Sequence, residues 1–178
     1  LLETATASCW SARTSGCWVF RDVFLNDSKL ERLQVVRGRI AARAAGSDAA
    51  DGPAAGARVM ILRGDSGARR APANEQALAE RLGADGWVIV DHTTMTLDEL
   101  AVRLAAAEVV VSVEGSQLAH AIGALPAGAA VVVLMPPARF TLILRDYFDR
   151  LGIAFGFHVG VPHADGTWTV EPEAVDRL

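Results

Sequence analysis

The chain has 178 residues, of which 51% are hydrophobic and 21% are charged, and its formal net charge is −4. This length fits one domain of ordinary size, or one domain with an added segment, and the composition is sufficient to bury a hydrophobic core. The acidic balance and the lack of a long basic run argue against a protein that wraps nucleic acid, and the longest apolar run, around residues 127–136, is too short to span a bilayer.

The start of the chain and its two cysteines bear on its processing and its redox state. The chain starts at Leu1 without a secretory signal pattern, so we expect it to be part of a longer protein. Cys9 and Cys17 are the only cysteines, and they either form a disulfide across a short loop or remain free thiols in a reducing compartment. His and Cys residues do not follow a zinc-type spacing, and we expect neither a metal nor another cofactor.

The first quarter of the chain differs from the rest. Residues 1–25 show no clear periodicity and are expected to form irregular structure or short strands. From residue 27 or 28 to about 45, apolar residues recur at three- and four-residue spacing, which predicts a helix. A loop rich in Gly, Ser, Asp, Ala and Pro follows over 46–56. We therefore expect an N-terminal linking segment with one helix over 1–50, which is the remnant of a missing domain or the link to one, and a separate domain over 57–178.

Strand and helix patterns alternate within that second domain. Thr96 with Glu99 three residues later has the spacing of a capping box. The strand segments are continuous apolar runs, as expected for parallel strands covered on both faces. The alternation predicts an α/β fold with a doubly wound, mostly parallel, Rossmann-like sheet and right-handed crossovers. Strands are expected over 58–62, 87–90, 109–113, 130–135 and 154–159, and helices over 73–82, 97–106, 116–124, 140–151 and a short terminal one from Pro172.

Arginines follow the first strand of this predicted sheet. Arg63 comes directly after the apolar run, and Arg69 and Arg70 lie in the loop behind it. Guanidinium groups bind phosphate oxygens in a fork, which suits a diphosphate. Most surface arginines are merely solvated, but Arg63 lies at the strand end where open α/β sheets bind ligands. These three arginines are therefore candidates for substrate binding.

Two polar residues begin the next predicted helix. Asn74 is a good N-cap residue, and a carboxylate such as Glu75 is favoured by the helix dipole. Capping alone explains both residues, so they are weaker candidates for substrate binding than the arginines.

The strand over 109–113 ends in a carboxylate and small residues, and a helix is expected to begin at once. The backbone N–H groups of Gly115 and Ser116 would then lie at a helix start, which suits phosphate. Glu114 either accepts a proton from a hydroxyl, contacts a sugar, or caps the helix. His120, on the second turn, is the second candidate for a catalytic base, although a lone histidine there is often a satisfied helix residue.

Several other site types are disfavoured. No G-x-G-x-x-G follows the first strand, no Walker-type loop is present, and Ser116 lacks the flanking glycines of a hydrolase elbow. A receiver-like signalling domain expects acidic residues at the first strand end and a later lysine. This chain has Arg63 there, and Lys29 is its only lysine.

In this order of elements, over about residues 58–160, the chain resembles the glycosyltransferase family 61 domain, of the bacterial capsular polysaccharide biosynthesis type. Two departures from the family signature His-Gly-Ala-x-Leu-x-Asn matter for the chemistry: Glu114 stands in place of His, and His120 stands in place of Asn. The matching features are the strand ending in Ile61-Leu62-Arg63, the arginine loop to Asn74-Glu75, the Gly86-Trp87-Val88-Ile89-Val90 strand, the helix over 96–106, the segment Glu114-Gly115-Ser116-Gln117-Leu118-Ala119-His120, and the stretch from Leu125-Pro126 to Leu134.

The resemblance implies one half of a GT-B-like architecture, with the nucleotide sugar held by residues 57–178. It implies inverting, metal-independent transfer from a nucleotide-diphosphate donor, a UDP-sugar being favoured, to a glycan or other hydroxyl acceptor. Arg63 with Arg69 or Arg70 would bind the diphosphate, and Glu114 or His120 would be the base. The family context implies a cytoplasmic protein or one peripheral to the inner membrane. The alternative is a non-catalytic nucleotide or sugar-phosphate binding module of a polysaccharide-biosynthesis protein.

Overall fold

A computed structural model describes residues 10–14, 17–21, 26–46, 52–64 and 70–175, the first two segments by their backbone alone. Those two segments are strands β1 (Trp10–Thr14) and β2 (Cys17–Arg21), which pair as an antiparallel hairpin. The short strands expected near the N-terminus are thus present. Cys9 lies outside the described residues, so both states of the cysteine pair stay predictions.

The main sheet has five strands, all parallel, in the order β4-β3-β5-β6-β7. This arrangement confirms the predicted α/β, Rossmann-like fold, and its order is that of flavodoxin-like sheets. The strands at its centre are apolar on both faces, which explains their uninterrupted hydrophobic runs. The strands are β3 (Ala57–Leu62), β4 (Val88–Asp91), β5 (Ala107–Val113), β6 (Ala130–Met135) and β7 (Ala154–Val159).

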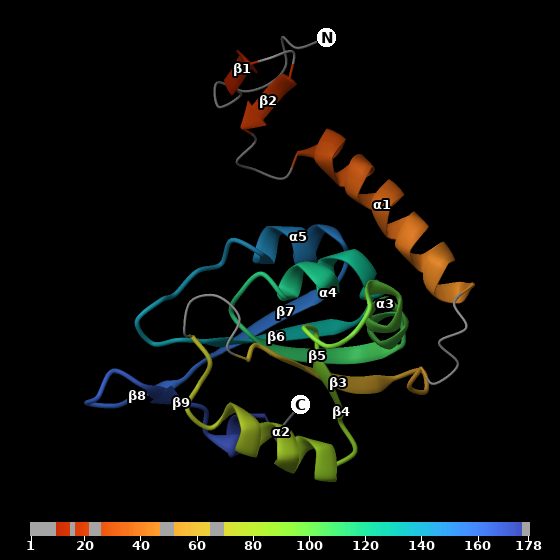
Figure 1. Cartoon of the computed structure of the whole chain (residues 1–178). Helices are drawn as coiled ribbons and strands as arrows, with labels where there is room; N and C mark the ends of the chain where they lie inside the picture. The colour runs from red at the N-terminus through yellow and green to blue at the C-terminus, as the bar shows by residue number, and fades with distance from the viewer. Residues whose placement is uncertain (1–9, 15–16, 22–25, 47–51, 65–69, 176–178) are drawn as a thin grey trace.

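Helices cover both faces of this sheet (Figure 1). One face carries α3 (Leu97–Ala105), α4 (Leu118–Ala124) and α5 (Arg145–Arg150), with a core that includes Leu100, Leu118 and Phe148. The other face carries α2 (Glu75–Ala84) with the C-terminal segment, where β8 (Val161–Pro162) pairs with β9 (Trp168–Thr169) and the 3-10 helix η1 (Pro172–Ala174) follows. The connection from β3 to β4 runs along the sheet in the opposite direction to the three later connections between neighbouring strands in the sequence. Since crossovers between parallel strands share one hand, α2 lies on the opposite face of the sheet from α3, α4 and α5.

The strand order reverses between β3 and β5. The chain moves from β3 outward to β4, then returns past β3 to β5 and continues to β6 and β7. Loops that leave the carboxyl ends of β3 and β5 therefore diverge to opposite faces, and sheets of this kind bind ligands in the crevice between such loops. Arg63 and Glu114 follow the two strands directly, so the fold brings these two sequence candidates to the same edge.

Three helices begin later than the sequence pattern predicts. α2 begins at Glu75 instead of residue 73. α4 begins at Leu118 instead of Ser116, because residues 115–120 first form tight turns with i to i−3 backbone bonds. α5 begins at Arg145 instead of Phe140, since the Phe140 ring packs edge-on against Phe157 of β7, with 5.1 Å between the ring centroids, and its segment stays non-helical.

The N-terminal helix α1 (Asp27–Ala45) has no buried residue of its own and packs on α3 and α4. Leu30 and Leu33 reach the core on that side of the sheet. The Arg37 guanidinium donates to the carbonyls of Ile122 and Leu125 (Nη2 to Leu125 O, 2.6 Å) at the end of α4. Burial lowers the pKa of Arg37. None of the described helices is long and apolar enough to cross a membrane.

The predicted capping box at the start of α3 is present. The Thr96 backbone N–H donates to Glu99 Oε2 at 2.8 Å, and the Glu99 N–H donates to Thr96 Oγ1 at 3.3 Å. We expect Thr96→Ala to lower the free energy of unfolding by about 1 kcal/mol, because one helix N–H loses its acceptor. Urea denaturation measures this, with Glu99→Gln as the milder comparison because glutamine keeps an acceptor. Equal stability of Thr96→Ala and wild type would contradict it.

Candidate active site

The turn after β3 is held by a buried carboxylate. Glu75 Oε1 accepts from the Arg63 backbone N–H at 2.9 Å, and Oε2 accepts from the Gly64 N–H at 3.0 Å. Gly64 has a φ of +58°, a conformation that favours glycine. Glu75 therefore acts from the first turn of α2 to fix the backbone that carries the Arg63 side chain.

A buried glutamine connects the ends of β3 and β5. Gln117 Oε1 accepts from Arg63 Nη1 at 2.9 Å, while its Nε2 donates to Val113 O at 2.6 Å and to Ser112 Oγ at 3.2 Å. Ser112 Oγ in turn donates to Ile61 O on β3 at 2.9 Å. The carbonyl of Val113 can only accept, so the amide oxygen of Gln117 must face the guanidinium. This network fixes the orientation of Arg63.

Glu114 lies between two further arginines. Its Oε2 is 3.3 Å from Arg70 Nη1 and 3.2 Å from Arg139 Nε, and its side chain is only 8% exposed. Arg70 is positioned by its own carbonyl, which accepts from Trp168 Nε1 at 3.1 Å. Arg139 lies in the turn after β6, where its N–H donates to Pro136 O at 2.9 Å. The carboxylate thus orients two guanidinium groups that come from different loops.

The three arginines form one electrostatic group. We call Arg63, Arg70 and Arg139 the arginine cluster. Burial lowers the pKa of Arg63, and the positive charges of Arg70 and Arg139 act in the same direction, while nearby carboxylates oppose them. Three guanidinium groups face Glu114 and Glu75, which leaves a net positive charge at the crevice. Such a group is suited to an anion with several oxygens.

Two histidines lie beside the same edge. His92 follows β4, and its Nδ1 is 3.1 Å from Leu62 O at the end of β3. A carbonyl only accepts, so Nδ1 carries the proton in this contact. The His120 ring on α4 lies with its centroid 6.0 Å from that of His92. Burial and then the neighbouring His92 lower the pKa of His120, so His120 is a neutral imidazole at pH 7 and can accept a proton.

The remaining sequence candidates have different surroundings. Asn74 binds the Val170 backbone at both ends of its amide, donating to the carbonyl at 2.8 Å and accepting from the N–H at 3.0 Å, and it makes no side-chain cap bond to α2. Ser116 is exposed beside the buried Gly115. Within the described part of the chain, the backbone N–H groups of Gly115 and Ser116 have no acceptor. Arg69 lies outside the described residues.

Four residues of this site were not singled out by the sequence. Ser112 and Gln117 could have been noticed, since each is a polar residue next to long apolar runs and both are buried. His92 and Arg139 lie in the loops that follow β4 and β6, and only the sheet order brings them to the same edge. Among the residues that the structure describes, no three His, Cys, Asp or Glu side chains are grouped as metal ligands.

Gly115 is required by the position of Arg63. A Cβ atom at residue 115 would overlap Arg63 Nη1 and Gln117 Oε1. We expect Gly115→Ala to lower the free energy of unfolding by about 1–3 kcal/mol, the usual cost of overpacking a buried site. Urea denaturation measures the loss. Gly38→Ala on α1, where a Cβ meets nothing within 4 Å, is the matched control and should be neutral or stabilising. Similar stability changes in both variants would contradict the steric argument.

Comparison with known proteins gives one family. The model of the family described as glycosyltransferase 61 matches residues 6–132. The matched range includes the hairpin, α1, and the sheet as far as the first residues of β6. His92 and His120 lie within it, and Arg139 lies beyond it. A search of curated proteins found no match. Because the family model covers well over half of the chain, this protein belongs to the glycosyltransferase 61 family.

Proposed function

We propose that this domain transfers a sugar from a nucleoside diphosphate donor, a UDP-sugar, to a hydroxyl group of a glycan acceptor, with inversion and without a metal. Family membership supports the general class of glycosyltransferase. The observation that carries the finer proposal is the convergence of the arginine cluster at the crevice between β3 and β5.

The arginine cluster is the donor side of the proposal. In glycosyl transfer the diphosphate leaves with increasing negative charge, and stabilisation of that charge lowers the barrier. Arg63 is oriented in advance by Gln117, and Arg70 and Arg139 by Glu114. The N–H groups of Gly115 and Ser116 add donors beside them. Arginines that are already oriented need little reorganisation when the charge develops, so they can replace the cation that other transferases use.

His120 is the proposed base. The acceptor O–H bond breaks as its proton moves to a nitrogen of His120, and the acceptor oxygen forms a bond to the anomeric carbon. The bond from that carbon to the diphosphate oxygen breaks, and its electron pair leaves with the nucleoside diphosphate. A single displacement of this kind inverts the anomeric centre. The lowered pKa of His120 keeps the imidazole free to accept this proton near neutral pH.

Glu114 is assigned a positioning role. Its Oε2 already faces two guanidinium groups, and a proton on that oxygen would break both contacts. Among the described residues His120 forms no such ion pair, and it follows Gln117 by one turn, with its backbone N–H bonded to Gln117 O at 3.1 Å. The two ion pairs of Glu114 therefore favour His120 over Glu114 as the base.

Calorimetric titration of the chain tests the proposal. UDP, GDP and ADP are compared with uridine and with UDP-sugars, and release of UDP is then followed in the presence of glycan acceptors. We expect saturable binding of a nucleoside diphosphate and much weaker binding of uridine, because the arginine cluster recognises the phosphates. Absence of nucleoside diphosphate binding by the folded chain would overturn the donor site. Binding without any turnover would favour the non-catalytic module.

A further inference from the structure

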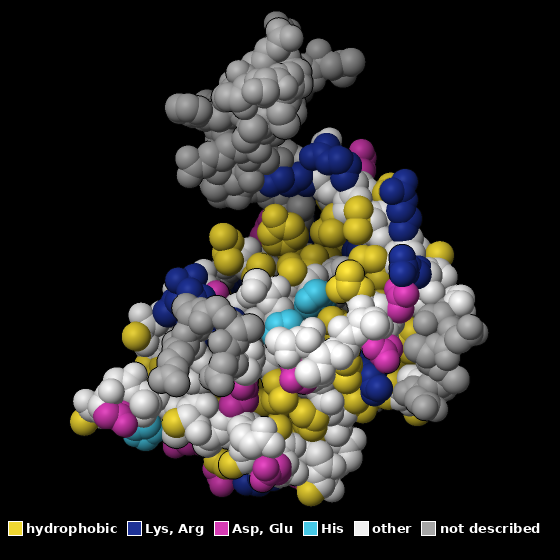
Figure 2. All heavy atoms as spheres, viewed as in Figure 1, with side chains coloured by type: hydrophobic (Ala, Val, Ile, Leu, Met, Phe, Trp, Pro, Cys, Tyr) yellow, Lys and Arg dark blue, Asp and Glu magenta, His cyan; other side chains and the backbone are white. Residues whose placement is uncertain are grey.

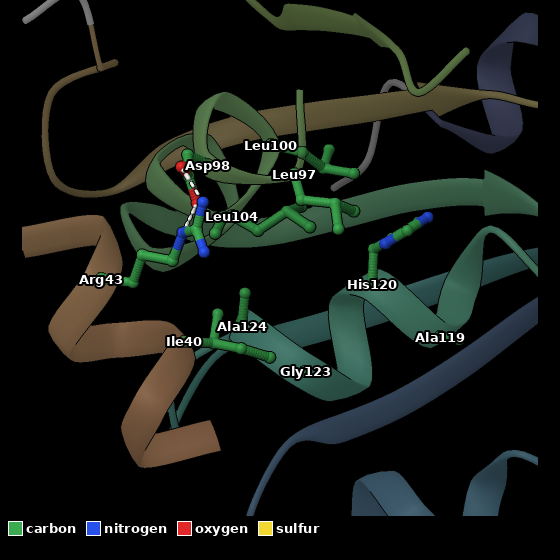
Figure 3. A pocket seen from close by; sticks show the side chains of 11 residues that line it. Ile40, Arg43, Leu97, Asp98, Leu100, Leu104, Ala119, His120, Gly123 and Ala124 are labelled. Carbon is green, nitrogen blue, oxygen red and sulfur yellow. Dashed lines mark hydrogen bonds and ion pairs between the residues drawn. The ribbon is translucent and has the colours of Figure 1, made fainter. Parts of the chain in front are cut away.

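A pocket of about 310 Å³ lies beside His120, between α1, α3 and α4. Figure 3 shows His120 on α4 at one end of this pocket, Leu97 and Leu100 of α3 above it, and Ile40 of α1 toward the other end. The volume is at the lower end of the range of ligand pockets, ~300–1,000 Å³. In Figure 2, hydrophobic and histidine side chains lie next to one another on this face.

Two polar contacts hold the walls of the pocket in place. Arg37 joins α1 to the end of α4, and Arg43 joins α1 to Asp98 on α3, with Nη2 at 2.9 Å from Oδ2. The second contact is drawn in Figure 3. α1 is thereby fixed to both other walls. The pocket is thus a preformed space rather than a gap between loosely packed helices.

The lining determines what kind of group can enter. It is made mainly of leucine, isoleucine and alanine side chains, and the charged side chains in it, Arg43 and Asp98, neutralise each other. His120 is uncharged at neutral pH because its pKa is lowered. An anionic or zwitterionic group would lose its hydration without gaining a partner. An uncharged apolar group would bury Leu97, which is 71% exposed at present.

We propose that this pocket binds the apolar part of the acceptor, an alkyl or aryl aglycone, and so brings a neighbouring hydroxyl to His120. The inference rests on the proposed function, since it assigns His120 as the base and makes the acceptor a glycoside with an apolar group. Binding of a non-reacting part of the acceptor would fix the orientation of the hydroxyl that reacts.

Binding of n-hexyl β-glucoside, compared with methyl β-glucoside, tests the pocket. The two share their sugar, so the difference isolates the alkyl chain. We expect the hexyl compound to bind at least about tenfold more tightly, since each buried methylene contributes up to about fourfold. NMR should show the His120 ring signals shifting with hexyl glucoside, while those of His163 in the β8–β9 hairpin stay unchanged. Equal affinity of the two glucosides would overturn the inference.

Two variants and one control check the location of the bound alkyl chain. Gly123→Leu fills the pocket, because a Cβ there already meets Ile40 Cδ1 at 3.2 Å, and Gly38→Leu adds the same side chain to the open face of α1. The gain from the hexyl chain should disappear in the first and persist in the second. Leu97→Ser, at an exposed position, should reduce the gain without affecting folding. Persistence of the full gain in both Gly123→Leu and Leu97→Ser would overturn the assignment.

UDP titration of the same samples separates the two proposals. UDP binding without any alkyl effect overturns the pocket inference and leaves the proposed function intact. An alkyl effect without binding of any nucleoside diphosphate overturns the acceptor assignment together with the proposed function. Self-association that Gly123→Leu abolishes, measured by sedimentation, would show a second polypeptide in the pocket and would also overturn the inference.

Discussion

Replacement of Arg63 by alanine is expected to weaken UDP binding by about an order of magnitude or more, the size of one charge-assisted contact. Arg63 is the most buried member of the arginine cluster, with 6% exposure, and Gln117 holds its guanidinium in the crevice. A contact formed by an arginine oriented in advance loses little side-chain entropy when the ligand binds. Calorimetric titration of UDP into both proteins measures the change.

Arg58→Ala is the matched control. Arg58 lies near the start of β3, whereas Arg63 follows the end of that strand, and the Arg58 guanidinium lies 5.2 Å from the centre of the Trp87 ring. This variant should bind UDP as wild type does. Thermal unfolding of both variants shows whether the fold is kept. Unchanged UDP affinity in a folded Arg63→Ala protein would remove Arg63 from the donor site.

Replacement of His120 by glutamine is expected to reduce kcat by roughly 10²–10⁴-fold, the usual contribution of a general base, with UDP affinity nearly unchanged. The imidazole accepts the acceptor proton in this proposal, whereas the arginine cluster holds the donor. Initial rates of UDP release under saturating donor and acceptor give kcat. His163→Gln, in the β8–β9 hairpin and bonded to Thr169, is the control and should keep the wild-type rate.

The pH dependence follows from the direction of the His120 shift. The pKa of His120 lies below its ordinary value of 6.5, because of burial first and of His92 second. The acid limb of kcat/KM should therefore lie below pH 6.5 and disappear in His120→Gln. A limb at or above pH 6.5, or one that persists in the variant, would exclude His120 as the base.

The free energy of unfolding should also depend on the titration of His120, and like the rate it should decrease at acidic pH. The unfolded chain binds the His120 proton more tightly than the folded chain, so the free energy of unfolding is highest above pH 6.5. It should decrease as pH falls from 6.5 to the lower folded pKa, and the decrease should be smaller in His120→Gln. Urea denaturation at several pH values measures both curves. Identical curves would show that His120 titrates equally in both states.

The sequence by itself determined the α/β class, the five strands and the contact at the start of α3. Strands buried on both faces are continuous apolar runs, and the Thr96–Glu99 box is a local pattern that needs no tertiary contact. It also placed Arg63 and Glu114 at strand ends, because a polar residue that follows an apolar run can be recognised from the sequence alone. Helix starts were less well predicted, since Phe140 packs on Phe157 from another element.

Only the tertiary structure decided which of these residues act together. The order β4-β3-β5-β6-β7 places the ends of β3, β5 and β6 side by side, so Arg139 reaches Glu114 across 25 residues of sequence. Sequence patterns carry no information on strand order, which depends on long-range packing of whole faces. For the same reason His92 meets His120, and α1 closes the pocket beside them, although nothing in the spacing of those residues indicates contact.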